Sequence, residues 1–97
     1  MLTNYKDVDN YEINVHFNNC YDWFNYKSNP PTDTILTMSF YYKGTFEDWI
    51  QFKDGKYRCY GGIGMTPKAF CKDKYCKKLV SILSAKGIKL LNYTTVE

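Results

Sequence analysis

Apolar and polar residues alternate along two stretches of the chain, which is the pattern of a β-strand with one buried face. Residues 11–17 (YEINVHF) alternate without a fault, and residues 35–42 (ILTMSFYY) alternate over most of their length. The second strand is expected to carry Leu36, Met38, Phe40 and Tyr42 on one face and Thr37, Ser39 and Tyr41 on the other. The pattern therefore predicts two strands that each turn one side to a core.

A hairpin is predicted around Asp54-Gly55, because this pair favours the positive φ angles of a two-residue type I′ turn. Closing the turn aligns two short runs of residues that both read as strands. The expected pairs are Phe52 with Tyr57 and Ile50 with Cys59 on one face, and Gln51 with Arg58 and Trp49 with Tyr60 on the other.

The connection between the strand at residues 35–42 and this hairpin must place the apolar side chains of both on the same face of the sheet. A two-residue loop at residues 43–44 would pair Phe46 with Tyr41, although the alternation places these two side chains on opposite faces. A three-residue loop at residues 43–45, with glycine at positive φ, places the apolar side chains of the two strands on the same face, and it is the loop we expect. This loop points Asp48 at the buried side of the sheet, so a bulge or a strand end is expected there.

A long helix is predicted from Thr66-Pro67 to about Lys86. Threonine is a good N-cap and proline fits the first helical position, while Gly87 suits the residue after the helix. The expected core stripe consists of Ala69, Tyr75, Cys76, Leu79, Val80 and Leu83, and Lys74, Lys77 and Lys78 lie on the opposite side.

Two further elements complete the predicted fold. Residues 18–27 suggest a short helix that ends before Asn29-Pro30-Pro31, and residues 88–93 read as a final strand. The fold class is therefore α+β: a small antiparallel sheet of four to five strands with one long helix on one face. The 97 residues are expected to form a single domain, with residues 1–10 as a polar, frayed lead-in.

Composition narrows the setting of the protein. Ten of the residues are Tyr, six Phe and two Trp, and lysine outnumbers arginine twelve to one. An AT-rich genome imposes this usage, and such genomes include many phages and mobile elements. The chain has no run of about 20 apolar residues and no apolar leader, so a cytoplasmic protein with reduced cysteines and no membrane partner is expected.

Positive charge is concentrated in one part of the chain. Residues 66–89 contain seven Lys and one acidic residue, whereas residues 1–65 contain six basic and eight acidic residues. The asymmetry is consistent with a basic face that meets phosphate or an acidic protein. The alternative is an ordinary solvated helix rich in lysine.

No set of residues in the sequence predicts catalysis or a cofactor. Cys71 and Cys76 lie five residues apart in the expected helix, too far along the axis for a disulfide and in different directions for a shared metal. A zinc site would also need Cys20 or His16, and His16 falls on a polar strand face. Glycines 61, 62 and 64 lack the pattern of a phosphate-binding loop. We therefore expect no enzyme, no metal and no cofactor, and a disulfide that includes Cys20 stays open.

The surplus of aromatic residues is the basis of the expected function. If the helix covers one sheet face, the other exposes aromatics beside an arginine, residue types that are enriched at interface hot spots. The expected partner-binding residues are Tyr41, Trp49, Arg58 and Tyr60 of the sheet, with Lys74, Lys77 and Lys78 of the helix. The alternative is that the short helix or a second copy of the chain buries this face.

Two functions compete on these residues. The first is a non-enzymatic phage or mobile-element protein that binds a larger host protein or protein–nucleic acid complex and blocks a host defence nuclease, as anti-CRISPR proteins do. The second is nucleic-acid binding, through the lysine face of the helix or by stacking on the sheet. The single arginine weighs against the second function, because arginine supplies most specific base contacts.

Overall fold

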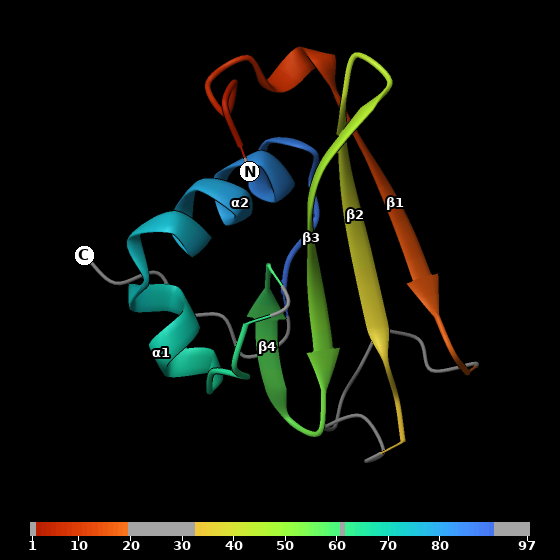
Figure 1. Ribbon diagram of the computed structural model, residues 1–97, viewed down its shortest axis with the longest axis vertical. Coiled ribbons are helices and arrows are strands. Elements are labelled where there is room, and N and C mark those ends of the chain that lie inside the picture. Colours follow the sequence, from red (N-terminus) through yellow and green to blue (C-terminus); the bar gives the residue numbers. More distant parts are fainter. Residues whose placement is uncertain (1, 20–32, 61, 91–97) are drawn as a thin grey trace.

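The protein folds into two layers, a four-stranded antiparallel sheet and a pair of helices that cover one of its faces (Figure 1). The computed structural model describes residues 2–19, 33–60 and 62–90. The predicted α+β class is confirmed. The strands are β1 (Tyr11–Phe17), β2 (Leu36–Tyr42), β3 (Thr45–Lys53) and β4 (Lys56–Cys59), and the helices are η1 (Val8–Asn10), α1 (Pro67–Lys72) and α2 (Lys74–Ala85).

The strands follow one another across the sheet in the order β1-β2-β3-β4. The β3–β4 hairpin turns at Asp54 (φ 52°) and Gly55 (φ 75°), as predicted for a type I′ turn. Three of the expected pairs form, namely Phe52 with Tyr57, Gln51 with Arg58 and Ile50 with Cys59. The expected pair of Trp49 with Tyr60 does not form, because β4 ends at Cys59.

The β2–β3 hairpin corrects the predicted loop. It turns on two residues, Lys43 (φ 49°) and Gly44 (φ 86°), and not on three. The predicted irregularity is present, because the register shifts between Phe40 and Tyr41: Phe40 lies opposite Asp48 and Tyr41 lies opposite Phe46, so Glu47 is the extra residue of β3 at this point. A bulge within the strands thus matches the faces of β2 and β3, which the prediction had assigned to the loop.

The bulge fixes which side chains face the core. Asp48 lies opposite Phe40 and is buried with an exposed fraction of 2%, as expected. Phe46 lies opposite Tyr41 instead, on the other face of the sheet. The pairing of Phe46 with Tyr41, which the sequence argument had rejected, is therefore the one that forms.

The predicted long helix is interrupted at Asp73, which has an extended backbone (ψ 129°). Its backbone N–H donates to the carbonyl of Ala69 and so ends α1, while its carboxylate accepts the N–H of Cys76 and caps α2. Asp73 serves both helix ends because a side-chain cap requires the non-helical backbone that terminates the preceding helix. Both predicted ends of the helical region hold: Thr66 caps α1, and Gly87 (φ 77°) follows α2.

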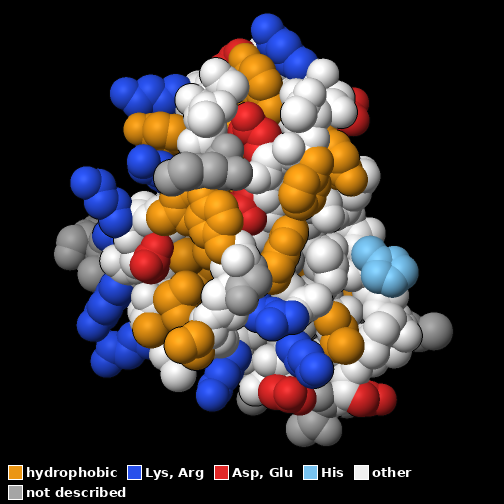
Figure 2. Space-filling view, viewed as in Figure 1, with side chains coloured by type: hydrophobic (Ala, Val, Ile, Leu, Met, Phe, Trp, Pro, Cys, Tyr) orange, Lys and Arg blue, Asp and Glu red, His pale blue; other side chains and the backbone are white. Residues whose placement is uncertain are grey.

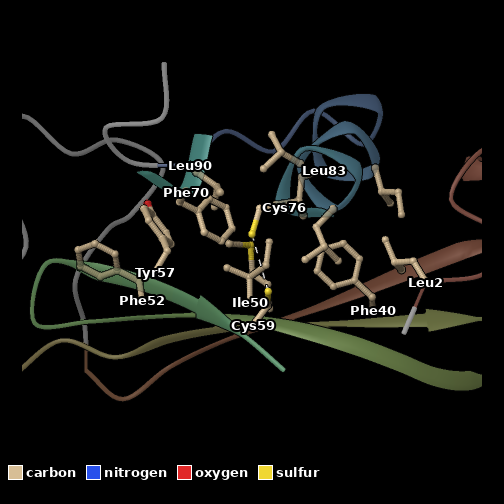
Figure 3. Close-up of a cluster of buried hydrophobic side chains, with 14 of the residues drawn as sticks. Leu2, Phe40, Ile50, Phe52, Tyr57, Cys59, Phe70, Cys76, Leu83 and Leu90 are labelled. Atoms are coloured by element: carbon tan, nitrogen blue, oxygen red, sulfur yellow. Dashed lines mark hydrogen bonds between the residues drawn. The ribbon is translucent and has the colours of Figure 1, made fainter. Parts of the chain in front are cut away.

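The core fills the space between the sheet and the helices (Figure 3). Six side chains of the sheet and four of the helices form its centre, each with an exposed fraction of 3% or less. They are Leu36, Met38, Phe40, Ile50, Phe52 and Tyr57, with Phe70, Leu79, Ile82 and Leu83. Ala69 of the predicted helix stripe is exposed instead, since α1 runs separately from α2.

The N-terminal segment corrects a further expectation. Residues 2–10 are packed and not frayed: Leu2 is buried in the core, and Tyr5 and Val8 pack against it. The backbone N–H of Leu2 donates to the Tyr75 hydroxyl (3.1 Å), which ties the segment to α2. In Figure 1 this segment crosses the end of the molecule where α2 meets the sheet.

Two predicted elements fall wholly or partly outside the described residues. The short helix and its ending, residues 20–31, lie there, as does the greater part of the predicted strand 88–93. Residues 88–90 are described and form no strand, although Leu90 is buried in the core. None of the described helices has the length and apolar character to cross a membrane.

Replacing Asp73 tests the interruption between the two helices. Asp73→Ala removes the cap of α2 and should lower the free energy of unfolding at pH 7 by about 1 kcal/mol, whereas Asp73→Asn should nearly preserve it. Backbone hydrogen bonding from Cys76 lowers the pKa of Asp73 below 3.8. The stabilisation is therefore present above that pH and is lost as the pH falls through the lower, folded-state pKa.

Urea unfolding of the three proteins between pH 7 and about pH 2 measures this effect. The difference in free energy of unfolding between the natural chain and Asp73→Asn should change with pH in the acid range, because the Asp73 carboxylate is protonated there. An Asp73→Ala protein as stable as the natural chain at pH 7 would contradict the capping role.

Candidate functional site

The face of the sheet turned away from α1 and α2 is the candidate site, and we name it the outer face. Side chains alternate along each strand, so the partners of the buried residues lie on this face. At its centre are Tyr41, Phe46, Trp49 and Arg58. Around them lie Glu12, Asn14 and His16 of β1, Thr37 and Ser39 of β2, Gln51 and Lys53 of β3, and Lys56 of β4.

Aromatic rings occupy the middle of the outer face. The rings of Tyr41 and Phe46 meet edge to face with centroids 5.6 Å apart, and the Phe46 side chain is 50% exposed. Trp49 lies opposite Ser39, one position along the face, and is partly buried. Such rings present a large apolar area at a small cost in conformational entropy, which favours contact with another macromolecule.

Arg58 is held in place over this aromatic surface. Its guanidinium carbon lies 5.6 Å from the centre of the Trp49 ring, and its Nε donates to the Gln51 side chain (2.8 Å). The cation–π contact and the hydrogen bond leave the remaining N–H groups of the guanidinium in a defined orientation. A carboxylate or phosphate of a partner would therefore meet a donor that is already ordered.

The hairpin end of the outer face is basic. Lys53 pairs with Lys56 across the two strands, and Arg58 follows on the same face. These three side chains line a surface hollow together with Asp54 and Gly64. The outer face therefore combines an aromatic middle with a positively charged end.

Tyr60 lies apart from the other predicted binding residues of the sheet. It follows the last residue of β4 with a positive φ of 60°, and its ring packs on Tyr75 of α2 with centroids 4.7 Å apart. The turn of the backbone carries Tyr60 toward the helix layer, although its side chain stays 49% exposed. The sequence argument placed it on the outer face because it extended β4 by one residue.

The predicted lysines belong to the helix layer and not to the outer face. Lys74 and Lys77 are exposed on α2, and Lys78 is partly buried with its Nζ 4.7 Å from the centre of the Tyr5 ring. Figure 2 shows Lys and Arg side chains along the side of the molecule where Figure 1 places α1 and α2. The helix lysines and the outer face therefore point in different directions, so a flat partner contacts one or the other.

The acidic residues beside the bulge form a second polar cluster, which lies on the core side. The Tyr75 hydroxyl donates to Oδ2 of Asp48 (2.5 Å), and the N–H of Trp49 donates to Oδ1 (2.6 Å). Glu47 accepts from the Tyr11 hydroxyl and from Thr3. Both carboxylates thus accept hydrogen bonds from groups of the fold itself: a tyrosine and a backbone N–H for Asp48, and a tyrosine and a threonine for Glu47.

Burial determines the protonation of these tyrosines. It raises the pKa of Tyr75 well above its usual range, and the hydrogen bond to Asp48 adds to the shift. Burial also raises the pKa of Tyr11, reinforced by its hydrogen bond to Glu47. The hydroxyls of Tyr75 and Tyr11 therefore stay protonated and donate hydrogen bonds. This behaviour fits a cluster that joins the sheet to the helices better than a cluster that transfers protons.

Phe46 is the residue of the outer face that sequence reasoning missed. The signal that reveals it is the two-residue type I′ preference of Lys43-Gly44, which requires Tyr42 to pair with Thr45 and Tyr41 with Phe46. The roles of Lys53 and Lys56 were also missed, although the Asp54-Gly55 turn pairs them directly.

Comparisons add no family or activity to this description. No protein-family model, curated protein or solved structure matches the chain. Among the described residues, no three His, Cys, Asp or Glu side chains are grouped so that they could hold a metal ion.

Replacing Tyr75 tests the polar cluster. Tyr75→Phe removes the hydroxyl that satisfies buried Asp48 and should lower the free energy of unfolding by about 1–3 kcal/mol. Tyr41→Phe, the same change on the outer face, is the matched control and should cost less than about 0.5 kcal/mol. Urea denaturation at neutral pH measures both, and equal losses for the two variants would contradict the structural role of the cluster.

Proposed function

We propose that this protein is a small, non-enzymatic binding module that covers a surface of a larger protein partner with its outer face. The observation that carries the proposal is the contact of Arg58 with Trp49, next to the exposed ring of Phe46 and the partly buried ring of Tyr41. Tryptophan, tyrosine and arginine contribute the largest share of binding energy at protein interfaces. A sheet that is fixed by a core on its other side presents them with little further ordering.

The described His, Cys, Asp and Glu side chains are spread over different parts of the fold, which supports binding over catalysis. In the part of the chain that the structure describes, His16 lies exposed on β1, and the three cysteines Cys59, Cys71 and Cys76 are buried. The acids near the bulge accept hydrogen bonds from tyrosines of the fold. These residues do not converge on an open site where a substrate would meet a nucleophile and a base.

The residue usage suggests the biological setting of the proposal. Many Lys, Tyr and Phe residues with a single Arg are typical of AT-rich phage and mobile-element genes. Small binding proteins in this setting commonly inhibit host defences, so we propose a host defence nuclease, acting with its nucleic acid, as the partner. The protein would then work in the host cytoplasm and inhibit in the manner of anti-CRISPR proteins, by occlusion.

Alanine variants test this function with a matched control. Trp49→Ala and Arg58→Ala should each weaken binding to the partner by about tenfold or more, since both remove central contacts of the outer face. A Lys74→Ala, Lys77→Ala double variant alters the helix layer and should bind like the natural chain. Circular dichroism verifies that each variant is folded.

The partner is captured from a bacterial host lysate on the immobilised protein, identified by mass spectrometry and purified for titration. Inhibition of DNA cleavage by that purified nuclease is the functional readout. Capture of no stoichiometric protein, or equal binding by the natural chain and the outer-face variants, would contradict the proposal.

Single-stranded nucleic acid is the second candidate ligand, and a specific observation favours it. Lys53, Lys56 and Arg58 continue the aromatic middle of the outer face at its hairpin end. Aromatic rings that stack bases beside cations that contact phosphates are the usual components of sequence-tolerant single-strand binding. The single arginine of the chain weighs against specific reading of bases, so the ligand proposed here is bound without regard to sequence.

Fluorescence anisotropy with a labelled single-stranded oligonucleotide tests this alternative. Binding should weaken with salt, and a Lys53→Gln, Lys56→Gln double variant should flatten the logarithmic salt slope by about 0.7 per lost phosphate contact. The Lys74→Gln, Lys77→Gln double variant is the control and should keep the slope of the natural chain. No change in anisotropy at low salt would exclude this ligand.

A further inference from the structure

Two cysteine side chains from different layers meet inside the core. Cys59 is the last residue of β4, Cys76 lies in the first turn of α2, and their sulfur atoms are 3.8 Å apart (Figure 3). Cys59 is 8% exposed and Cys76 is fully buried. The third described cysteine, Cys71, is also buried, but its thiol donates to the carbonyl of Lys68 (3.0 Å).

The backbone holds both thiols at this point. Cys59 lies opposite Ile50, on the face that the helices cover. The N–H of Cys76 donates to the carboxylate of Asp73 (2.9 Å), which fixes the first turn of α2. Two hydrogen bonds between Tyr57 and Met65 (2.8 and 2.6 Å) tie the chain after β4 back to the strand.

The two sulfur atoms lie in direct non-bonded contact. A disulfide requires about 2.05 Å between the sulfurs, so the pair must approach by about 1.8 Å. A side-chain rotation with a small shift of Cys59 at the end of β4 achieves this, because the outer edge of β4 is held only by the bridge between Tyr57 and Met65 and not by a further strand. The expected helix had separated Cys71 from Cys76, and it gave no reason to pair Cys76 with Cys59.

We propose that Cys59 and Cys76 form a redox-active dithiol that hydrogen peroxide converts to an intramolecular disulfide joining β4 to α2. The inference does not rest on the proposed function. Cys59 and its neighbour Arg58 point to opposite sides of the sheet. Oxidation of the two buried thiols is therefore independent of binding through the outer face.

The reaction is balanced in two steps. The Cys59 thiolate attacks one peroxide oxygen, the O–O bond breaks, and the released hydroxide takes up the thiol proton as water, leaving a sulfenic acid. The Cys76 thiol then attacks the Cys59 sulfur, the S–O bond breaks, and a second water leaves with the Cys76 proton. Two thiols are oxidised, and one peroxide is reduced to two waters.

Cys59 is the attacking residue for two reasons. It is the more accessible of the pair, next to Tyr60, where the chain leaves the strand. The hydrogen bond from the Cys76 thiol also lowers the pKa of Cys59, and the same bond raises the pKa of Cys76. Of the two residues, Cys59 therefore forms the reactive thiolate more readily.

Peptide mapping of the folded chain after treatment with hydrogen peroxide tests the proposal. A Cys20→Ser, Cys71→Ser background leaves only the proposed pair, and its titratable thiols should fall from two to none, with a cross-linked peptide that contains Cys59 and Cys76. Because the bond closes the loop between β4 and α2, the thermal midpoint should rise on oxidation and return with dithiothreitol.

Two further serine variants and the natural chain serve as controls for the cross-link between Cys59 and Cys76. Adding Cys59→Ser or Cys76→Ser to the background should abolish the cross-link and leave one titratable thiol. Peptide mapping of the natural chain gives the same test without any substitution. Two free thiols after treatment, oxidation of Cys59 to a sulfinic acid without a cross-link, or a disulfide that uses Cys20 or Cys71 in the natural chain would each overturn the proposal.

Discussion

The β-bulge between Phe40 and Tyr41 is the constraint that gives the two faces of the sheet their different characters. It makes Glu47 an extra residue of β3 between the residues opposite Phe40 and Tyr41 and so resets the alternation of side chains along β3. On the core side, Glu47 and Asp48 then accept hydrogen bonds from tyrosines of β1 and α2. On the outer face, the same reset brings Phe46 beside Tyr41. In a regular pairing of β2 with β3, without the bulge, an acidic residue would lie on the outer face and an aromatic ring on the core side.

The polar cluster beside the bulge also joins parts of the chain that are distant in sequence. The Tyr75 hydroxyl accepts from the N–H of Leu2 and donates to Asp48, so the N-terminal segment, α2 and β3 meet at one atom. These hydrogen bonds fix this end of the sheet to the helix layer. Under the proposed function, the rings and the arginine of the outer face would be held by the fold before a partner binds, which lowers the entropy cost of binding.

Local patterns in the sequence predicted the four strands of the sheet, the Asp54-Gly55 turn and both ends of the helical region, because each depends on a few neighbouring residues. The strand predicted for residues 88–93 does not form over its described residues, 88–90. The interruption at Asp73 was missed, since aspartate within a charged helix reads equally as a surface residue. The two-residue loop at residues 43–44 was missed because the prediction used the length of the loop to bring the buried faces of β2 and β3 to the same side. In the structure, a bulge three residues away from the loop does this instead. Tyr41, Trp49 and Arg58 share a face as expected, and Tyr60 does not, because a positive φ ends the strand before it.

The central claim is that the aromatic middle of the outer face, and no other surface, meets the partner. Hydroxyl-radical footprinting of the protein, free and bound to the captured partner, tests this claim most directly because it reports the exposure of individual side chains. The account predicts that Tyr41, Phe46 and Trp49 lose reactivity in the complex while Tyr60 and the exposed side of α2 keep theirs. Protection of α2 or Tyr60, with the outer-face rings as reactive as in the free protein, would contradict it.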